Sequence, residues 1–353
     1  MADDLSRCLI YGAYGYTGDL TARRAKALGK APILAGRSEA RTRALAASLG
    51  LPHRVFGLDD PAALDRGLEG VDVVIHAAGP FARTYRPMLD ACLRTKTCYL
   101  DITGEIEVFE ACAARGAEAE EAGVMVMPGV GFDVVPSDCL ASHLKRRLPS
   151  ATHLVLAFAS VGGGTSHGTA TTMVESLGRP NLVRRDGLLT EVRIGTLRRD
   201  IDFGRGPRPT LSIPWGDVST AWSSTRIPNI EVYTAVPRAA QLGAKAFGYL
   251  GGVLGSGPVQ RILKGRVDAA PPGPSDAQRE RAFSLFYGEA TDGQTTVRTR
   301  QRTPEGYTLT AATSLVIAER VLEGATEAGY RTPAMVYGPD LILELGGTER
   351  TDL

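Results

Sequence analysis

The first third of the chain alternates short apolar runs with amphipathic segments of helical periodicity. Each apolar run has the length of a buried strand, and each segment between two runs is long enough for a helix that leads to the next strand. This alternation predicts a parallel sheet covered by helices and close to complete by about residue 135. The expected strands lie at residues 8–11, 32–36, 54–58, 71–77, 98–101 and 124–127.

The pattern changes after residue 135, where the β-prone runs are no longer separated by regular helices. Asp292-Gly293 stands between the last two runs and is typical of a hairpin turn. We therefore expect a second domain of the α+β class with a mainly antiparallel sheet. Its expected strands lie at residues 154–159, 189–193, 210–213, 230–236, 282–287 and 295–300.

These patterns divide the chain into three parts. Residues 1–135 are expected to form an α/β domain with a Rossmann-like parallel sheet. Residues 136–305 would form an α+β domain for substrate binding or dimerisation. Residues 306–353 begin with an amphipathic helix and end in a tail with more Gly and Pro, and we expect this part to pack back on the first domain.

Residues 239–263 are rich in Gly, Ala, Leu, Phe and Tyr and precede a proline-rich linker at 270–274. Lys245 and the repeated glycines argue against a helix that spans a bilayer. The composition is compatible with a helix in a core or oligomer interface, with a lid over an apolar substrate, and with a helix on a membrane surface. A homodimer and a peripheral membrane contact both stay open.

The composition excludes several classes of function. The formal net charge of +1 provides no field that would recruit nucleic acid or an anionic membrane. The five cysteines form no C-x-x-C pair, and the sequence contains no cluster of metal ligands. The acidic start at Ala2-Asp3-Asp4 does not have the pattern of a signal peptide. We therefore expect a cytoplasmic protein without a metal site.

The strongest functional motif is the glycine-rich stretch between the first expected strand and the first expected helix. A residue without a side chain lets the backbone approach a phosphate there, and the N-terminus of the helix attracts negative charge. The stretch therefore predicts a dinucleotide site. Its residues are Gly12, Ala13, Tyr14, Gly15, Tyr16, Thr17 and Gly18.

The end of the second strand predicts which dinucleotide binds. Enzymes that prefer NAD usually place Asp or Glu here to bind the ribose 2′-hydroxyl, whereas an arginine accommodates the 2′-phosphate of NADP. The chain has Arg37-Ser38 and no acid before Glu39, which favours NADP(H).

Further cofactor contacts are expected where the later strands end, because ligands bind beyond the carboxyl ends of parallel strands. Asp59 could flank the adenine, and Asp101 either binds a cofactor ribose or caps the next helix. The exit of the fourth strand should line the ribose and nicotinamide. Its residues are Ala78, Gly79, Pro80 and Phe81.

Several separated motifs together resemble one family, the saccharopine dehydrogenase-like oxidoreductases. Within that family the chain looks most like the branch that includes the trans-acting enoyl reductases of bacterial lipid and polyketide assembly. The resemblance spans nearly the whole chain and implies a Rossmann domain that binds NADP(H), a second domain that covers the nicotinamide, and hydride transfer. The motifs lie at residues 12–18, 35–37, 79–81, 99–105 and 128–138, with further matches around 163–165, 288–290, 306–310 and 329–333.

Hydride transfer also requires a proton donor near the nicotinamide. The candidates are Tyr99, His76, His167 and Tyr85. Packing explains Tyr99 as well as chemistry does, because it ends an interior strand. His76 stands where relatives commonly have a small or amide residue, so it is either an extra polar group at the nicotinamide or a histidine with a structural role. His167 would face the site if its glycine-rich loop folded over the nicotinamide.

We therefore expect an NADPH-dependent oxidoreductase that reduces a C=C bond of an acyl or polyketide-like substrate, either free or bound to a carrier. One alternative is an imine reductase or amine dehydrogenase of the saccharopine dehydrogenase type. Another is a non-catalytic NADP-binding protein associated with a lipid surface. The absence of a basic cluster disfavours a saccharopine-like substrate, which has several carboxylates.

Overall fold

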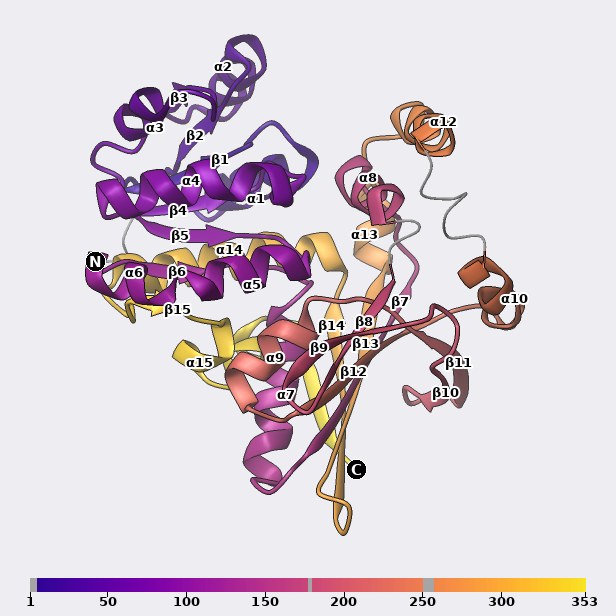
Figure 1. Ribbon diagram of the computed structural model, residues 1–353. Helices are drawn as coiled ribbons and strands as arrows, with labels where there is room; N and C mark the ends of the chain where they lie inside the picture. Colours follow the sequence, from indigo (N-terminus) through magenta and orange to yellow (C-terminus); the bar gives the residue numbers. More distant parts are fainter. Residues whose placement is uncertain (1–4, 177–179, 250–256) are drawn as a thin grey trace. The chain divides into compact units, whose positions relative to one another are not determined.

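The computed structural model describes residues 5–176, 180–249 and 257–353 (Figure 1). The chain divides into two compact units. Unit 1 consists of Met1–Val135 and Gly306–Gly338, and unit 2 consists of Pro136–Glu305 and Pro339–Leu353.

Unit 1 is built around sheet A, which has seven strands in the described residues, in the order β15-β6-β5-β4-β1-β2-β3. Every neighbouring pair is parallel. The strands β1, β2 and β4 are buried at every position, as expected for a parallel sheet covered on both faces. The strands are β1 (Cys8–Tyr11), β2 (Ile33–Gly36), β3 (His53–Val55), β4 (Val73–His76), β5 (Cys98–Asp101), β6 (Met125–Met127) and β15 (Gly329–Tyr330).

The helices of unit 1 follow the capping signals of the sequence. The Ser38 side chain accepts a hydrogen bond from Arg41 N at the start of α2, and Asp60 caps α3 with Pro61 at its first position. Arg115 separates α5 from α6, so residues 106–122 form two helices. The helices are α1 (Tyr16–Ala27), α2 (Glu39–Leu49), α3 (Pro61–Gly67), α4 (Phe81–Thr95), α5 (Ile106–Ala114), α6 (Gly116–Ala122), α14 (Gly306–Leu322) and α15 (Pro333–Tyr337).

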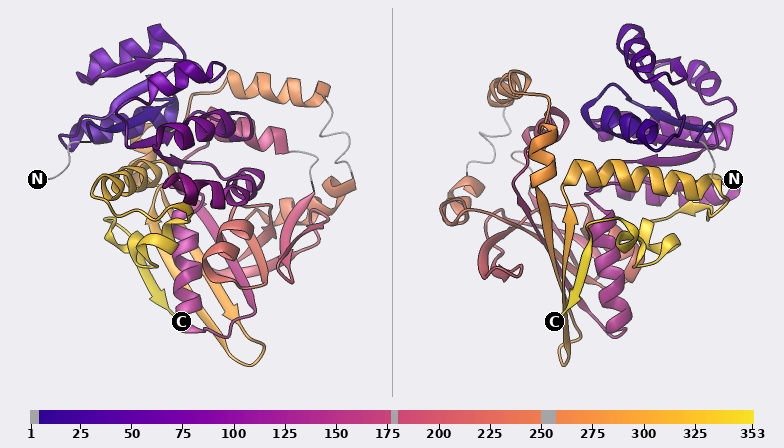
Figure 2. Two further views of the ribbon diagram at one scale, coloured as in Figure 1. Left: turned by 60° about the vertical axis from the view of Figure 1, so that its left-hand side comes forward. Right: turned by 180° about the vertical axis from the view of Figure 1, so that it is seen from behind.

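Helix α14 comes from the far end of the chain and lies beside α1, where it also packs on β4 and β5 (Figure 2). Most of its residues between Leu309 and Val321 are buried. The helix therefore completes one face of sheet A.

Unit 2 contains sheet B, which has nine strands in the described part of the chain, with a main path of β10-β11-β12-β7-β13-β14-β16. Only the β7–β12 pair among these described strands is parallel. The α+β prediction is confirmed, and the Asp292-Gly293 turn joins β13 to β14 as an antiparallel hairpin. The strands are β7 (His153–Val161), β8 (Asn181–Arg185), β9 (Leu188–Val192), β10 (Arg198–Asp202), β11 (Pro207–Ser212), β12 (Asn229–Ala235), β13 (Phe283–Thr291), β14 (Thr296–Pro304) and β16 (Glu349–Asp352).

The helices of unit 2 include the described parts of the apolar segment 239–263. Residues 250–256 of that segment lie outside the described residues, and its role as lid, interface or membrane-surface helix stays a prediction. The helices are α7 (Val135–Arg147), α8 (His167–Ser176), α9 (Asp217–Thr225), α10 (Arg238–Tyr249), α12 (Gly257–Asp268) and α13 (Asp276–Arg281), with a short 3-10 helix at Leu341–Glu344.

The end of the chain is divided between the two units. Gly306–Gly338 lie in unit 1, and Pro339–Leu353 lie in unit 2. There β16 pairs with β14, and the Arg350 guanidinium donates to Gln301 Oε1 at 3.1 Å and to Asp340 Oδ1 at 2.8 Å. The free edge of β14 and these polar contacts explain why the tail joins the second sheet.

Candidate cofactor site

The turn between β1 and α1 has a shape that only glycine permits. Gly12 has φ +81°, and a Cβ there would lie 2.9 Å from the backbone of Ala77. A Cβ on Gly18 would lie 2.4 Å from Gly12 O, so α1 can pack on the turn only without a side chain at this position. Gly15 is the N-cap residue of α1. Because glycine has no side chain, it cannot cap this helix end with a side-chain hydrogen bond. The arrangement fits a bound pyrophosphate, because the helix N-terminus offers backbone N–H groups.

The exit of β2 carries positive charge. Arg37 is exposed there. Burial raises the pKa of Tyr11 to about 12, and the nearby positive charge of Arg37 acts against this rise. Asp59 is exposed at the exit of β3, and its negative charge helps to raise the pKa of the Tyr11 hydroxyl. Glu39, the first acid after Arg37, is paired with Arg43 at 2.6 Å. The positive charge of Arg37 fits a negatively charged group such as the ribose 2′-phosphate of NADP.

The exit of β4 is organised by Thr84. Its hydroxyl donates to Ala78 O at 2.7 Å, so its oxygen can accept from His76 Nε2 at 3.0 Å. His76 is fully buried, and burial lowers its pKa to about 3. The imidazole is therefore neutral and engaged within the protein. Its catalytic role stays a prediction, and this placement favours the structural alternative. The peptide bond between Gly79 and Pro80 is cis, and Phe81 begins α4.

Asp101 and Tyr99 form a buried pair at the end of β5. The Tyr99 hydroxyl donates to Asp101 Oδ2 at 2.6 Å, while Oδ1 accepts from Thr103 N and Gly129 N, both at 2.9 Å. Burial raises the pKa of Tyr99 well above its usual range and that of Asp101 to about 6. In this structure Asp101 holds the loop after β6 against β5, and Tyr99 serves as its partner. Their predicted contacts with cofactor or substrate stay predictions.

Two further carboxyl groups, Glu105 and Asp133, lie at the same edge of sheet A. Glu105 accepts hydrogen bonds from Phe81 N at 2.9 Å and Ala82 N at 2.8 Å, so its carboxylate covers the N-terminus of α4. Asp133 packs so closely on Gly104 that a Cβ there would lie 2.6 Å from its Oδ2. Burial, and then the charge of Glu105, raise the pKa of Asp133 to about 7. We call Glu105 and Asp133 the edge pair.

The loop that carries Asp133 is fixed by helix α14. Thr310 Oγ1 accepts from Phe132 N at 3.0 Å, and the Thr313 hydroxyl donates to Val130 O at 2.6 Å. The first turn of α14 also reaches the glycine-rich turn, where the rings of Tyr307 and Tyr16 meet edge to face with centroids 5.0 Å apart. Sequence reasoning missed this support because α14 is far from both loops in the chain. The Gly131-Phe132-Asp133 motif was the one available signal.

His167 lies at the start of α8 in unit 2. Its Nε2 donates to Ala270 O at 2.6 Å, and its backbone N donates to Pro272 O at 3.0 Å. The residue therefore ties α8 to the proline-rich linker. Its role as a proton donor stays a prediction.

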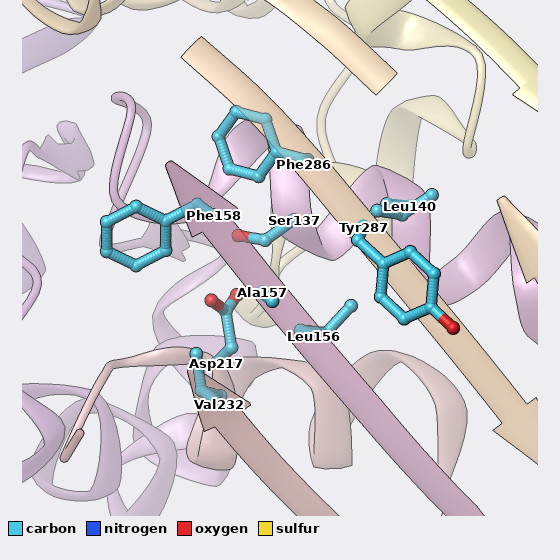
Figure 3. A pocket seen from close by; sticks show the side chains of 9 residues that line it. All are labelled: Ser137, Leu140, Leu156, Ala157, Phe158, Asp217, Val232, Phe286 and Tyr287. Carbon is cyan, nitrogen blue, oxygen red and sulfur yellow. The ribbon is translucent and has the colours of Figure 1, made fainter. Parts of the chain in front are cut away.

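A small void in unit 2 is lined by side chains of β7, β12 and β13 and of the helices α7 and α9 (Figure 3). Phe158 and Phe286 border it, and Asp217 reaches it from α9. The void has no room for a water molecule, so it belongs to the packed core and is not a substrate site.

The described residues contain no group of three or more His, Cys, Asp or Glu placed to hold a metal ion. Within the same residues, each helix is too short or too polar to cross a membrane.

Comparisons with known proteins agree with this architecture. Residues 8–127 match the family described as saccharopine dehydrogenase NADP binding domain. The whole chain superposes on the apo saccharopine dehydrogenase (L-Glu forming) of Saccharomyces cerevisiae with a TM-score of 0.68 and 16% identity, covering 98% of this chain and 99% of the other. This similarity confirms the expected fold, a parallel sheet in one unit and a mainly antiparallel sheet in the other.

Two curated relatives are trans-acting enoyl reductases. The protein of Mycobacterium leprae (strain TN) is 33% identical over 219 residues, which cover 57% of this chain and 52% of the relative. The protein of Mycobacterium ulcerans (strain Agy99) is 30% identical over 226 residues, covering 59% and 53%. The chain thus spans about half the length of the curated relatives it matches.

Proposed function

We propose that this protein is an NADPH-dependent reductase of a C=C bond. The premise is that residues 8–127 belong to the saccharopine dehydrogenase NADP binding domain family. The coarser part, an NADP-dependent oxidoreductase, rests on the family match and on the fold. The finer part, an acyl or polyketide-like substrate that is free or carried by another protein, is supported by the two enoyl reductase relatives.

The observation that carries the proposal is that a dinucleotide turn and a protonatable carboxyl lie at the same edge of sheet A. When bound, NADPH supplies a hydride. Reduction of an α,β-unsaturated thioester also needs a proton, so that the β-carbon gains the hydride and the α-carbon gains the proton. The protein must therefore hold an acid beside the cofactor site.

Asp133 has the properties of that acid. It is partly exposed, and its pKa is raised to about 7, so a large fraction carries a proton near neutral pH. Glu105 accepts hydrogen bonds from two backbone N–H groups, and its charge helps to keep the proton on Asp133. We propose that Asp133 is the acid and that Glu105 supports it electrostatically.

Tyr99 and His76 are less suited to this role. The Tyr99 hydroxyl is buried and donates to Asp101, and His76 is neutral because burial lowers its pKa to about 3. We therefore propose Asp133 as the proton donor in place of these two residues.

The test follows the absorbance of NADPH with matched substrates. We expect oxidation of NADPH with an α,β-unsaturated acyl thioester and none with an amino acid plus a keto acid or aldehyde, which together provide an imine. The same acyl group on a carrier protein and on a short thiol would show whether a carrier is required. Turnover with the imine pair alone would overturn the C=C assignment. NADPH binding without turnover of either substrate would favour the non-catalytic alternative.

A further inference from the structure

Tyr14, in the middle of the glycine-rich turn, lies against the end of β2. A Cβ on Gly36 would be only 2.5 Å from Tyr14 Cε1, so the ring occupies the space that a side chain at position 36 would need. The ring is partly exposed. The turn predicted to bind the pyrophosphate is thus in direct contact with the strand end where cofactor specificity is decided.

Arg41, on the first turn of α2, lies on the same ring. Its guanidinium carbon is 4.4 Å from the centroid of Tyr14, and its Nη2 donates to Tyr14 O at 3.3 Å. A cation–π contact and a hydrogen bond together hold a side chain that otherwise has four rotatable bonds. Since the guanidinium group has five N–H donors, most remain for a ligand after the bond to Tyr14 O.

Arg43 provides a contrast on the same helix. It pairs with Glu39 at 2.6 Å, and both side chains are about two thirds exposed, at 65% and 64%. Its charge is therefore already compensated. Arg41 has no ion pair with an acid in the described part of the chain, so its positive charge is added to that of Arg37 beside the Ser38 cap.

We propose that Arg41 is a second arginine that binds the 2′-phosphate of NADP(H), together with Arg37, and that Tyr14 positions it. Arginine suits this task because its planar donors match phosphate oxygens in pairs. The N-terminus of α2 and the hydroxyl of Ser38 favour the same negative group. The inference rests on NADP binding by unit 1 and is independent of the proposed substrate.

Binding of cofactor fragments tests the role of Arg41 without any turnover. We would titrate the full chain with NADPH, NADH, 2′-AMP and 5′-AMP by calorimetry. Arg41→Ala should weaken NADPH and 2′-AMP about 10- to 100-fold, the range for a lost charge-assisted contact. It should change the affinity for NADH and 5′-AMP by less than about 3-fold. The double variant Glu39→Ala/Arg43→Ala removes the compensated pair as a whole and is the matched control, and we expect it to leave all four affinities near those of the wild type.

Tyr14 variants test the positioning role. Tyr14→Phe retains the ring and the backbone carbonyl and should keep the preference for NADPH. Tyr14→Leu should lose part of the preference, since Arg41 is then no longer held in place. Equal losses of NADPH and NADH in Arg41→Ala, or no loss in either, would overturn the proposal. If wild-type protein bound neither dinucleotide, NADP binding itself would fail, which is a separate outcome.

Discussion

Asp101 and Asp133 are both carboxyl groups at the carboxyl edge of sheet A, but their surroundings differ. Asp101 is fully buried and accepts three hydrogen bonds, from Tyr99, Thr103 and Gly129. Asp133 keeps some exposed surface, and burial of its carboxyl group, followed by the charge of Glu105, raises its pKa to about 7. A buried carboxyl with a full set of partners fixes the structure, whereas a partly exposed one beside a like charge can exchange a proton.

The residues around Asp101 are also buried and packed on one another. His76 pairs with Asp101 in the register of β4 and β5, and its ring lies 6.3 Å from that of Tyr99. We call His76, Tyr99 and Asp101 the interior cluster. We therefore propose that the interior cluster stabilises the fold and that the edge pair provides the proton for the reaction. Variants of each group can test this proposal.

The largest effect is expected for Asp133→Asn. Loss of a proton donor should lower turnover by about 10²- to 10⁴-fold, while NADPH affinity stays within about 3-fold of the wild type. Because the folded-state pKa is raised to about 7, removal of the carboxylate should not destabilise the protein above that pH. Steady-state kinetics and thermal unfolding would measure the two effects.

The pH dependence of the wild type provides the control for that variant. An acid with a pKa of about 7 is active only when protonated, so turnover should fall as the pH rises through about 7. A turnover that is flat from pH 6 to 8, or Asp133→Asn retaining wild-type turnover, would contradict the assignment of chemistry to the edge pair.

The next effect is expected for Asp101→Ala, which removes the acceptor of three buried hydrogen bonds. We expect a loss of about 2 to 4 kcal/mol in the free energy of unfolding, because the three donors stay buried without partners. Tyr99→Phe removes one donor and should cost only about 1 kcal/mol. Urea unfolding of both variants would measure this, and turnover in Tyr99→Phe should stay close to wild type. A large loss of turnover there would return Tyr99 to the list of proton donors.

The last effect concerns His76 and the pH dependence of stability, and it is small near neutral pH. Burial lowers its folded-state pKa to about 3, so the folded protein keeps it neutral, whereas the unfolded chain binds a proton below about pH 6.5. Stability from this group is therefore lost as the pH falls from 6.5 towards 3, by about 2 kcal/mol at pH 5. His76→Gln does not titrate and keeps a donor for Thr84. Its unfolding free energy relative to wild type should rise by this amount between pH 8 and pH 5.

The local sequence was sufficient for the elements that position the cofactor turn. Gly12 and Gly18 are needed where backbone atoms approach closely, and Ser38 and Asp60 start helices by capping them, so each signal lies within a few residues of its effect. Alternation of apolar runs likewise predicted the parallel sheet, because strands buried on both faces require it.

The pairing of strands at the sheet edges, and contacts between segments far apart in the chain, could not be predicted from local sequence. The strands β8, β10, β15 and β16 were not expected, since short or polar runs become strands only when a neighbour offers free backbone groups.

The sequence by itself determined an NADP-binding parallel sheet followed by a mainly antiparallel one, because periodicity and glycine spacing are local properties. Tertiary structure alone distinguished Asp101 from Asp133, since burial, hydrogen-bond partners and the charge of Glu105 depend on segments brought together by folding. The same holds for Arg41, which differs from Arg43 only through its contact with Tyr14 and the absence of an acidic partner in the described residues. A residue's chemistry depends on its neighbours in space, and these are set by the fold.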